Sequence, residues 1–273
     1  YNVFVNANIY SNNMILKNAT LIEKDGKIVN IGTGIKIPEN SIVNDLAGKY
    51  IYPSFIEIHS SFGIKNPQRN SRSRSSQYEP SRKGYYWNDH ILSDYNSMKD
   101  YTYSQRDAKG LRDIGFGVVN SHRSNGVHRG TSFTIGLIDN QNESYRIISD
   151  KTAEHFSFTR SVTSNQSYPS STMGAMALIR QLYYDADWYS QGISESKDLA
   201  LESVINNRKL PKLFDANDKL NVYRAAKISE EFDLEFVIKG SGKEYENVRE
   251  LKKFNNKLII PVNFPNAFDV SNA

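Results

Sequence analysis

The sequence predicts an α/β fold with a small β unit at its amino terminus, and two patterns carry this prediction. The first fifty residues contain short strand-like runs joined by turn residues, and Asp25-Gly26 between two such runs is a strong hairpin signal. The last third of the chain alternates strand-like and helix-like segments, which implies parallel strands with right-handed crossovers. This alternation fits both a closed barrel and an open sheet.

At the amino terminus we expect a small antiparallel β unit. Its strands cover residues 3–10, 19–24 and 27–32, followed by a short run around Ile42-Val43. A continuous apolar run then extends over residues 50–59. Because this run is too short for a typical helix and is rich in β-branched and aromatic residues, it favours a buried strand.

The middle of the chain predicts a long loop and then a mixture of helix and strands. Residues 66–97 are polar and irregular, which is typical of a functional or mobile loop. A helix is expected over 104–114, closed by Gly115. Strands are expected over residues 116–120, 131–138 and 155–158.

A long helix is expected next, with Ser170 as its cap and its end near Tyr189. Apolar residues recur along it at helical spacing, and we interpret them as core rather than as a cofactor site. This stripe consists of Met176, Leu178, Ile179, Leu182, Tyr183 and Ala186.

The last third predicts three strands, over residues 213–215, 234–238 and 258–262. Asn217 can cap a helix that runs to Phe232. Gly240-Ser241-Gly242 turns into a further helix, and its amides could hold an anion, although a helix-capping turn is the preferred interpretation.

Composition excludes several classes of function. The net charge of +4, from 34 basic and 30 acidic residues, lacks the concentrated basic face of a nucleic-acid binder. We interpret the one basic cluster, which lies among serines, as a solvated loop, with phosphate binding as the alternative. The members of this cluster are Arg69, Arg72, Arg74, Arg82 and Lys83.

The chain contains no cysteine, so disulfides and thiolate chemistry are excluded. No apolar run approaches the roughly 20 residues that span a bilayer. The chain begins at Tyr1 without a Met, so we expect that its start has been removed and that its end is open to the same trimming.

Two consecutive phrases carry a family resemblance. "DGKIVNIG" begins at Asp25, and "LAGKYIYPSFIEIHSSFG" begins at Leu46. In residue type and spacing they resemble the opening of the amidohydrolase superfamily. The phrases "WNDHI", "GVHRGTS", "YPSSTMGAMALIRQ" and "LIIPVNFPNAFDV" extend the resemblance, toward a bacterial subgroup of large amidohydrolase-like proteins.

The resemblance implies a small composite β-sandwich over residues 1–52. It also implies an amidohydrolase-like (β/α)₈ TIM-type barrel over 53–273, incomplete at its carboxyl end. Members of this subgroup tend to carry a second amidohydrolase-like unit further along the chain.

In this family, a His-x-His phrase at the end of the first barrel strand binds zinc or another divalent metal, because alternate residues of a strand point to the same side. Here the phrase reads His59-Ser60-Ser61, so one histidine is replaced by a serine, and an acidic residue survives beside it as Glu57. The later ligand phrases correspond to Asp215-Ala216-Asn217 and Lys239-Gly240-Ser241, and neither contains histidine.

The resemblance therefore implies a vestigial site at His59, Ser61, Asp215, Lys239 and Gly240. Because Asp215 and Lys239 are expected at the carboxyl ends of neighbouring strands, we predict a salt bridge between them in the vacated metal pocket.

We interpret the other four histidines as loop and hydrogen-bonding residues, with a new kind of metal site as the alternative. His122 and His128 flank a glycine-containing loop, and His90 and His155 are scattered in the sequence.

By resemblance the function is hydrolysis of C–N bonds by a metal-activated hydroxide. Because the ligands are missing, we expect a metal-free, catalytically silent amino-terminal half of a larger hydrolase, with no cofactor of its own. Its partner would be a second amidohydrolase-like unit of the same protein or another copy of the chain. The alternatives are an active hydrolase with an altered metal site and a ligand-binding module. Exported relatives favour an extracytoplasmic location, periplasmic or secreted, over a cytoplasmic one.

Overall fold

The computed structural model describes residues 1–65, 67–69, 77–78, 84–139 and 143–262. The chain divides into two compact units, Tyr1–Phe55 and Ile56–Ala273. That residues 1–52 form a β-sandwich and residues 53–273 a barrel stays a prediction.

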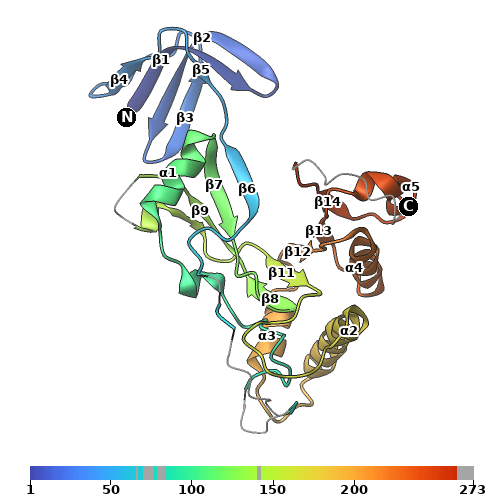
Figure 1. Ribbon diagram of the computed structural model, residues 1–273. Coiled ribbons are helices and arrows are strands. Elements are labelled where there is room, and N and C mark those ends of the chain that lie inside the picture. Colours follow the sequence, from blue (N-terminus) through green and yellow to red (C-terminus); the bar gives the residue numbers. More distant parts are fainter. Residues whose placement is uncertain (66, 70–76, 79–83, 140–142, 263–273) are drawn as a thin grey trace. The chain divides into compact units, whose positions relative to one another are not determined.

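The amino-terminal unit is one five-stranded sheet with the order β3-β2-β1-β4, in which β5 also pairs with β1 (Figure 1). The strands are β1 (Asn2–Ser11), β2 (Met14–Lys24), β3 (Lys27–Gly32), β4 (Ile42–Asp45) and β5 (Tyr50–Ile51). β1, β2 and β3 are antiparallel neighbours, as predicted, but β4 and β5 run parallel to β1. The prediction of an entirely antiparallel unit is wrong because the loop after β3 returns the chain to the far side of β1.

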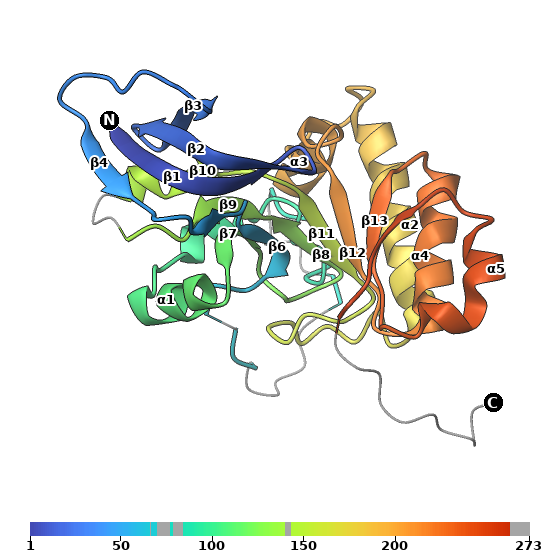
Figure 2. The same cartoon turned by 90° about the horizontal axis from the view of Figure 1, so that it is seen from above.

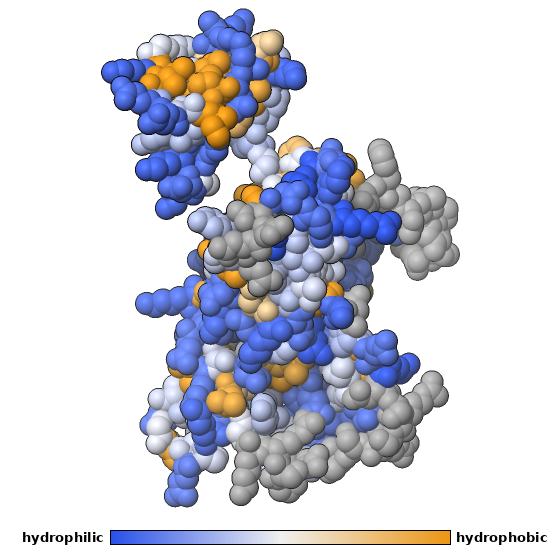
Figure 3. All heavy atoms as spheres, turned by 90° about the vertical axis from the view of Figure 1, so that its left-hand side faces the viewer, coloured by the Kyte–Doolittle hydropathy of each residue, from blue (hydrophilic) through white to orange (hydrophobic). Residues whose placement is uncertain are grey.

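The predicted Asp25-Gly26 turn joins β2 and β3, and both residues have positive φ, at 53° and 77°. This is the conformation that a two-residue type I′ hairpin requires. The small core of this unit is formed by Ala7, Ile9, Ala19 and Leu21. Apolar residues also gather on an exposed face of the unit in Figure 3, and large exposed side chains of its strands include Ile28 and Ile42.

The apolar run over 50–59 is not one buried strand. It is split into β5 and β6 (Phe55–Ser60), because Pro53 has no backbone N–H to continue a ladder. β6 is an edge strand, and the side chains of Phe55 and Ile56 are 66% and 58% exposed.

The carboxyl-terminal unit begins with a four-stranded sheet in the order β10-β9-β7-β6. Its other strands are β7 (Phe116–Ser121), β9 (Phe133–Gly136) and β10 (Ile147–Ser149). The predicted helix is confirmed as α1 (Gln105–Asp113), which contacts β7. The Ser104 hydroxyl caps it by accepting the Asp107 N–H at 3.3 Å. Short 3₁₀ turns lie at Ser97–Asp100 and Glu143–Tyr145.

A second sheet of this unit has the order β14-β13-β12-β11-β8. Its strands are β8 (His128–Thr131), β11 (Glu154–Ser157), β12 (Lys212–Asp215), β13 (Phe236–Lys239) and β14 (Lys257–Ile259). β11 to β14 are parallel, as the alternation predicts, and β8 is antiparallel to β11. Closure of the strands into a (β/α)₈ barrel stays a prediction.

Helices lie between the parallel strands. They are α2 (Thr172–Tyr189), α3 (Leu199–Asn206), α4 (Lys219–Glu231) and α5 (Val248–Leu251), with a 3₁₀ turn at Glu244–Asn247. α2 and α4 contact each other beside the sheet (Figure 2). Each capping residue lies one position after the predicted one. Ser171 caps α2 and Asp218 caps α4. None of the described helices is long and apolar enough to cross a membrane.

The strand predicted over 131–138 is confirmed as β9, but its first residue, Thr131, ends β8 in the other sheet. Ser132 separates them, and its backbone N–H donates to the Ala153 carbonyl at 2.8 Å. This bond turns the chain out of one sheet and into the other.

Some expectations lie outside the described residues. These are most of the basic cluster, at Arg72, Arg74, Arg82 and Lys83, and the end of the "LIIPVNFPNAFDV" phrase from residue 263 onward.

The predicted apolar stripe of α2 is confirmed as core. All six of its residues are buried, and they pack with Phe156, Phe214 and Phe236 from the strands. A buried ionic group lies at the amino ends of β11 and β12. Glu154 is bridged at 3.4 Å by His128 and at 3.3 Å by Lys212. Lys212 Nζ also donates to carbonyls that follow α3, so this group ties the helix end to the sheet.

We expect Ile179→Ala to lower the free energy of unfolding by about 2–5 kcal/mol, because it opens a cavity in this core. Met173→Ala is the matched control on the same helix. Met173 is 65% exposed, so its change should stay within about 0.5 kcal/mol. Urea denaturation checks both values, and equal effects of the two substitutions would show that the stripe does not carry the packing.

Candidate functional site

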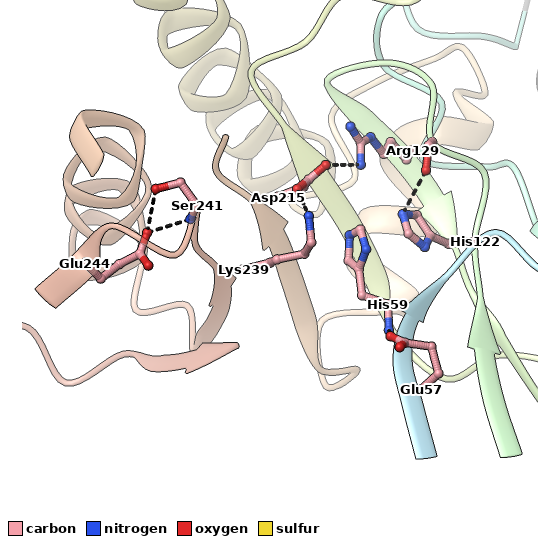
Figure 4. A network of polar contacts seen from close by, with 9 residues as sticks. Glu57, His59, His122, Arg129, Asp215, Lys239, Ser241 and Glu244 are labelled. Atoms are coloured by element: carbon pink, nitrogen blue, oxygen red, sulfur yellow. Dashed lines mark hydrogen bonds and ion pairs between the residues drawn. The ribbon is translucent and has the colours of Figure 1, made fainter. Parts of the chain in front are cut away.

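The carboxyl ends of β12 and β13 bring together an acid and a base. Asp215 and Lys239 end these parallel strands and are paired in register. The Lys239 Nζ lies 2.9 Å from Asp215 Oδ1, which confirms the predicted salt bridge (Figure 4).

A second cation, Arg129 of β8, occupies the other oxygen of the same carboxylate. Its Nη1 lies 3.1 Å from Asp215 Oδ2, and its side chain is 4% exposed. The next residue, Gly130, has φ of 77°, and a Cβ there would lie 2.0 Å from the Tyr95 carbonyl oxygen. Only glycine fits this approach, so Gly130 lets the 95–97 segment close over β8 and hold Arg129 in place.

The two cations set the electrostatics of Asp215. Burial acts to raise the pKa of this carboxyl group, but Arg129 and Lys239 outweigh it and hold the pKa below its usual value. Asp215 is therefore ionised, with both oxygens engaged, which makes it a poor general base.

His59 and His122 come from neighbouring strands of the first sheet. Asn120 Nδ2 donates to the Ile58 carbonyl at 3.1 Å, and the His122 N–H donates to the Ser60 carbonyl at 2.9 Å. These bonds fasten β6 to the end of β7 and set the two imidazole centroids 4.3 Å apart.

His155 of β11 completes a cluster with these two residues. Its ring stacks on His122, with centroids 3.8 Å apart and an interplanar angle of 13°, and lies 5.8 Å from His59. One nitrogen of each ring lies within 4.8 Å of the other two. His155 is distant in sequence from the other two histidines, and the convergence of the strands brings it beside them.

The cluster is uncharged near neutral pH. Burial lowers the pKa of His59 to about 4. Burial also lowers the pKa values of His122 and His155 well below the usual value, and the neighbouring histidines add to this effect. His90, outside the cluster, has a pKa of about 4 for the same main reason.

The other sequence-predicted positions lie elsewhere. Ser61 lines a depression of about 820 Å³ beside α1, together with Tyr103 and Leu111. The Glu57 carboxylate accepts the His59 backbone N–H at 3.0 Å and so is turned to the strand itself (Figure 4).

The Gly240-Ser241-Gly242 turn is occupied by its own chain. The Gly240 N–H donates to the Ile259 carbonyl, and the Ser241 and Gly242 N–H groups donate to the Glu244 carboxylate at 2.5 and 2.8 Å. These amides already hold an acidic group of the chain itself, while the residue at the N-cap of the following 3₁₀ turn is Lys243.

A metal ion does not fit the family's positions in this chain. Among the described residues there, His59 is the one imidazole, and Asp215 is already paired with two cations. A dication coordinated by Asp215 would have to displace Arg129 and Lys239 from the two carboxylate oxygens that they occupy.

The chain is similar to the crystal structure of an amidohydrolase from Thermotoga maritima MSB8. The TM-score is 0.72 at 19% identity, over 96% of this chain and 70% of that one. An amidohydrolase and a prolidase complexed with N-methylphosphonate-L-proline both align at a TM-score of 0.44. Their identities are 12% and 11%, over 96% and 95% of this chain and 66% and 65% of theirs.

No family model and no curated protein matches the chain. At this level of identity, the likeness to the Thermotoga structure shows that the chain has an amidohydrolase-type fold, and the fold alone does not assign an activity.

We expect Asp215→Asn to lower the free energy of unfolding by about 3–5 kcal/mol, because it leaves the buried Arg129 without a counter-charge. Asp187→Asn is the matched control. Asp187 pairs with Arg208 where both side chains are more than half exposed, so its loss should cost less than about 1 kcal/mol. Chemical denaturation measures both, and a small effect at Asp215 would contradict a buried bridge.

Stability should fall as the pH decreases from about 6.5 to about 4. In this window the unfolded chain binds protons on its histidines, while His59 and His90 of the folded chain, with pKa values of about 4, stay neutral. We therefore expect a lower urea midpoint at pH 5 than at pH 7.5, and a smaller difference in His90→Gln. Equal midpoints at the two pH values would show that the folded-state histidines titrate normally.

Proposed function

We propose that this chain is a catalytically silent unit of an amidohydrolase-type hydrolase, a pseudoenzyme unit that shapes substrate access for an active partner. The observation that carries the proposal is the bridge from Asp215 to both Arg129 and Lys239. By resemblance, Asp215 and Lys239 stand in the phrases that hold metal ligands in active relatives. Here they neutralise each other.

The electrostatics of Asp215 support this reading. Hydrolysis of an amide needs a base that takes a proton from the attacking water. The two cations lower the pKa of Asp215, and together they engage both of its oxygens. A carboxylate stabilised in this way neither binds a metal ion readily nor accepts a proton at neutral pH.

The partner in this proposal is a second amidohydrolase-like unit of the same protein or another copy of the chain. Exposed apolar side chains on β6 and on the amino-terminal sheet support it, since such surface is typical of interfaces.

An active hydrolase with an altered metal centre is the second candidate, and the cluster of His59, His122 and His155 favours it. Three histidines are a sufficient protein ligand set for a catalytic zinc ion, which lowers the pKa of bound water. In that case the imidazoles would hold the ion and Arg129 or Lys239 would orient an anionic group of the substrate.

We expect the purified chain to hydrolyse neither N-acetyl amino acids, nor X-Pro dipeptides, nor cyclic imides above the buffer blank, with or without added zinc or manganese. Product release measured by liquid chromatography checks this result. Asp215→Ala is the control for contaminating activity. Hydrolysis that is present in the parent chain and lost in Asp215→Ala would overturn the silent-unit proposal.

A further inference from the structure

We propose that His59, His122 and His155 form a binding site for one divalent transition-metal ion, with zinc as the best match. The ligand atoms are His59 Nε2, His122 Nδ1 and His155 Nε2. Of the positions that the family resemblance assigns to a metal, this site shares only His59. It goes beyond the proposed function, because it requires no hydrolysis.

The geometry brings the three nitrogens close to one another from three strand ends. One ring nitrogen of each residue lies within 4.8 Å of the other two, although His59 belongs to β6, His122 directly follows β7 and His155 belongs to β11. Nitrogens at 2.0–2.1 Å from a tetrahedral zinc ion are about 3.4 Å apart. Because 4.8 Å is the upper bound of the separations, the widest pair of nitrogens has to approach by at most about 1.4 Å on binding, and the stacked rings of His122 and His155 have to turn apart.

Unmet hydrogen-bonding capacity is the second, independent observation. In each of the three rings one nitrogen, His59 Nε2, His122 Nδ1 or His155 Nε2, is buried and has no hydrogen-bond partner within the described part of the chain. His122 and His155 are each 1% exposed. Buried polar atoms without partners are rare and destabilise a fold, so three of them around one point indicate a missing ligand. Ring stacking alone would leave all three unsatisfied.

The donor set selects the kind of ion. Imidazole nitrogens suit zinc, copper and nickel, whereas magnesium and calcium prefer oxygen ligands. Ser124 Oγ lies 3.4 Å from His122 Nε2, the outer nitrogen of that ring. A contact of this type fixes the ring and leaves Nδ1 as the ligand atom.

The charges nearby fix the role of the ion. Asp215 is shared by Arg129 and Lys239, so this carboxylate is not free to coordinate the ion. We assign the ion a structural role, in which it joins β6 to β7 and β11.

The test is to titrate the chelator-washed full chain with zinc and with cobalt. Binding is measured by calorimetry, by cobalt absorbance and by ¹⁵N NMR of histidine-labelled protein. We expect one ion per chain and zinc-induced shifts of the three named ring nitrogens, with no shift on addition of magnesium. Absence of stoichiometric binding, or shifts confined to other nitrogens, would overturn the proposal. These readouts use the unmodified chain and do not depend on activity, so they are independent of the silent-unit proposal.

Variants sharpen the test. His59→Asn, His122→Asn and His155→Gln should each weaken zinc binding at least tenfold, since each removes one of three ligands. His90→Gln is the matched control, because His90 is fully buried with an unpartnered Nε2 but lies outside the cluster. The His90→Gln variant should bind zinc as tightly as the parent chain. If all three cluster variants bind zinc as tightly as the control, the site is wrong. If a variant fails to fold by circular dichroism, the nitrogen shifts of the parent chain decide.

Discussion

The parallel register of β12 against β13 is the constraint on which the charged site depends. It sets Asp215 level with Lys239, so that a short bridge forms between residues that are distant in sequence. The antiparallel pairing of β8 with β11 then brings Arg129 to the remaining oxygen of Asp215. Because all of these contacts follow from strand pairing, a shift of one residue in either ladder would separate the charges and leave Arg129 buried alone.

Much of this architecture follows from local sequence signals. Asp25-Gly26 fixes a hairpin because both residues tolerate positive φ, and the apolar spacing of α2 fixes which face is buried. Boundaries that depend on tertiary pairing were less predictable. Pro53 divides one apolar run, and Ser132 divides another between two sheets, although each run looks continuous in hydropathy. α3 (Leu199–Asn206) was not predicted, although Asp198 provides a capping carboxylate at its start.

The candidate site was predictable only where residues follow a shared phrase. Asp215 and Lys239 were found because both end a recognisable strand. His122 and His155 were not, because no spacing along the chain links them, and their proximity arises from the convergence of β7 and β11. The available signal was positional, since His122 directly follows a strand and His155 lies within one. Arg129 was hidden in the same way, inside the "GVHRGTS" phrase, whose Gly130 marks a close backbone approach.

The open side of β6 has a consequence for how this chain behaves in solution. Within the described residues one backbone edge of β6 has no neighbouring strand, and such an edge, beside the exposed side chains of Ile56 and Ile58, is a template for strand pairing between molecules. Natural edge strands usually carry lysine, proline or a bulge to block such pairing, and within β6 the one charged residue is Glu57. A segment that covers this edge would therefore act as much by protecting solubility as by adding contacts.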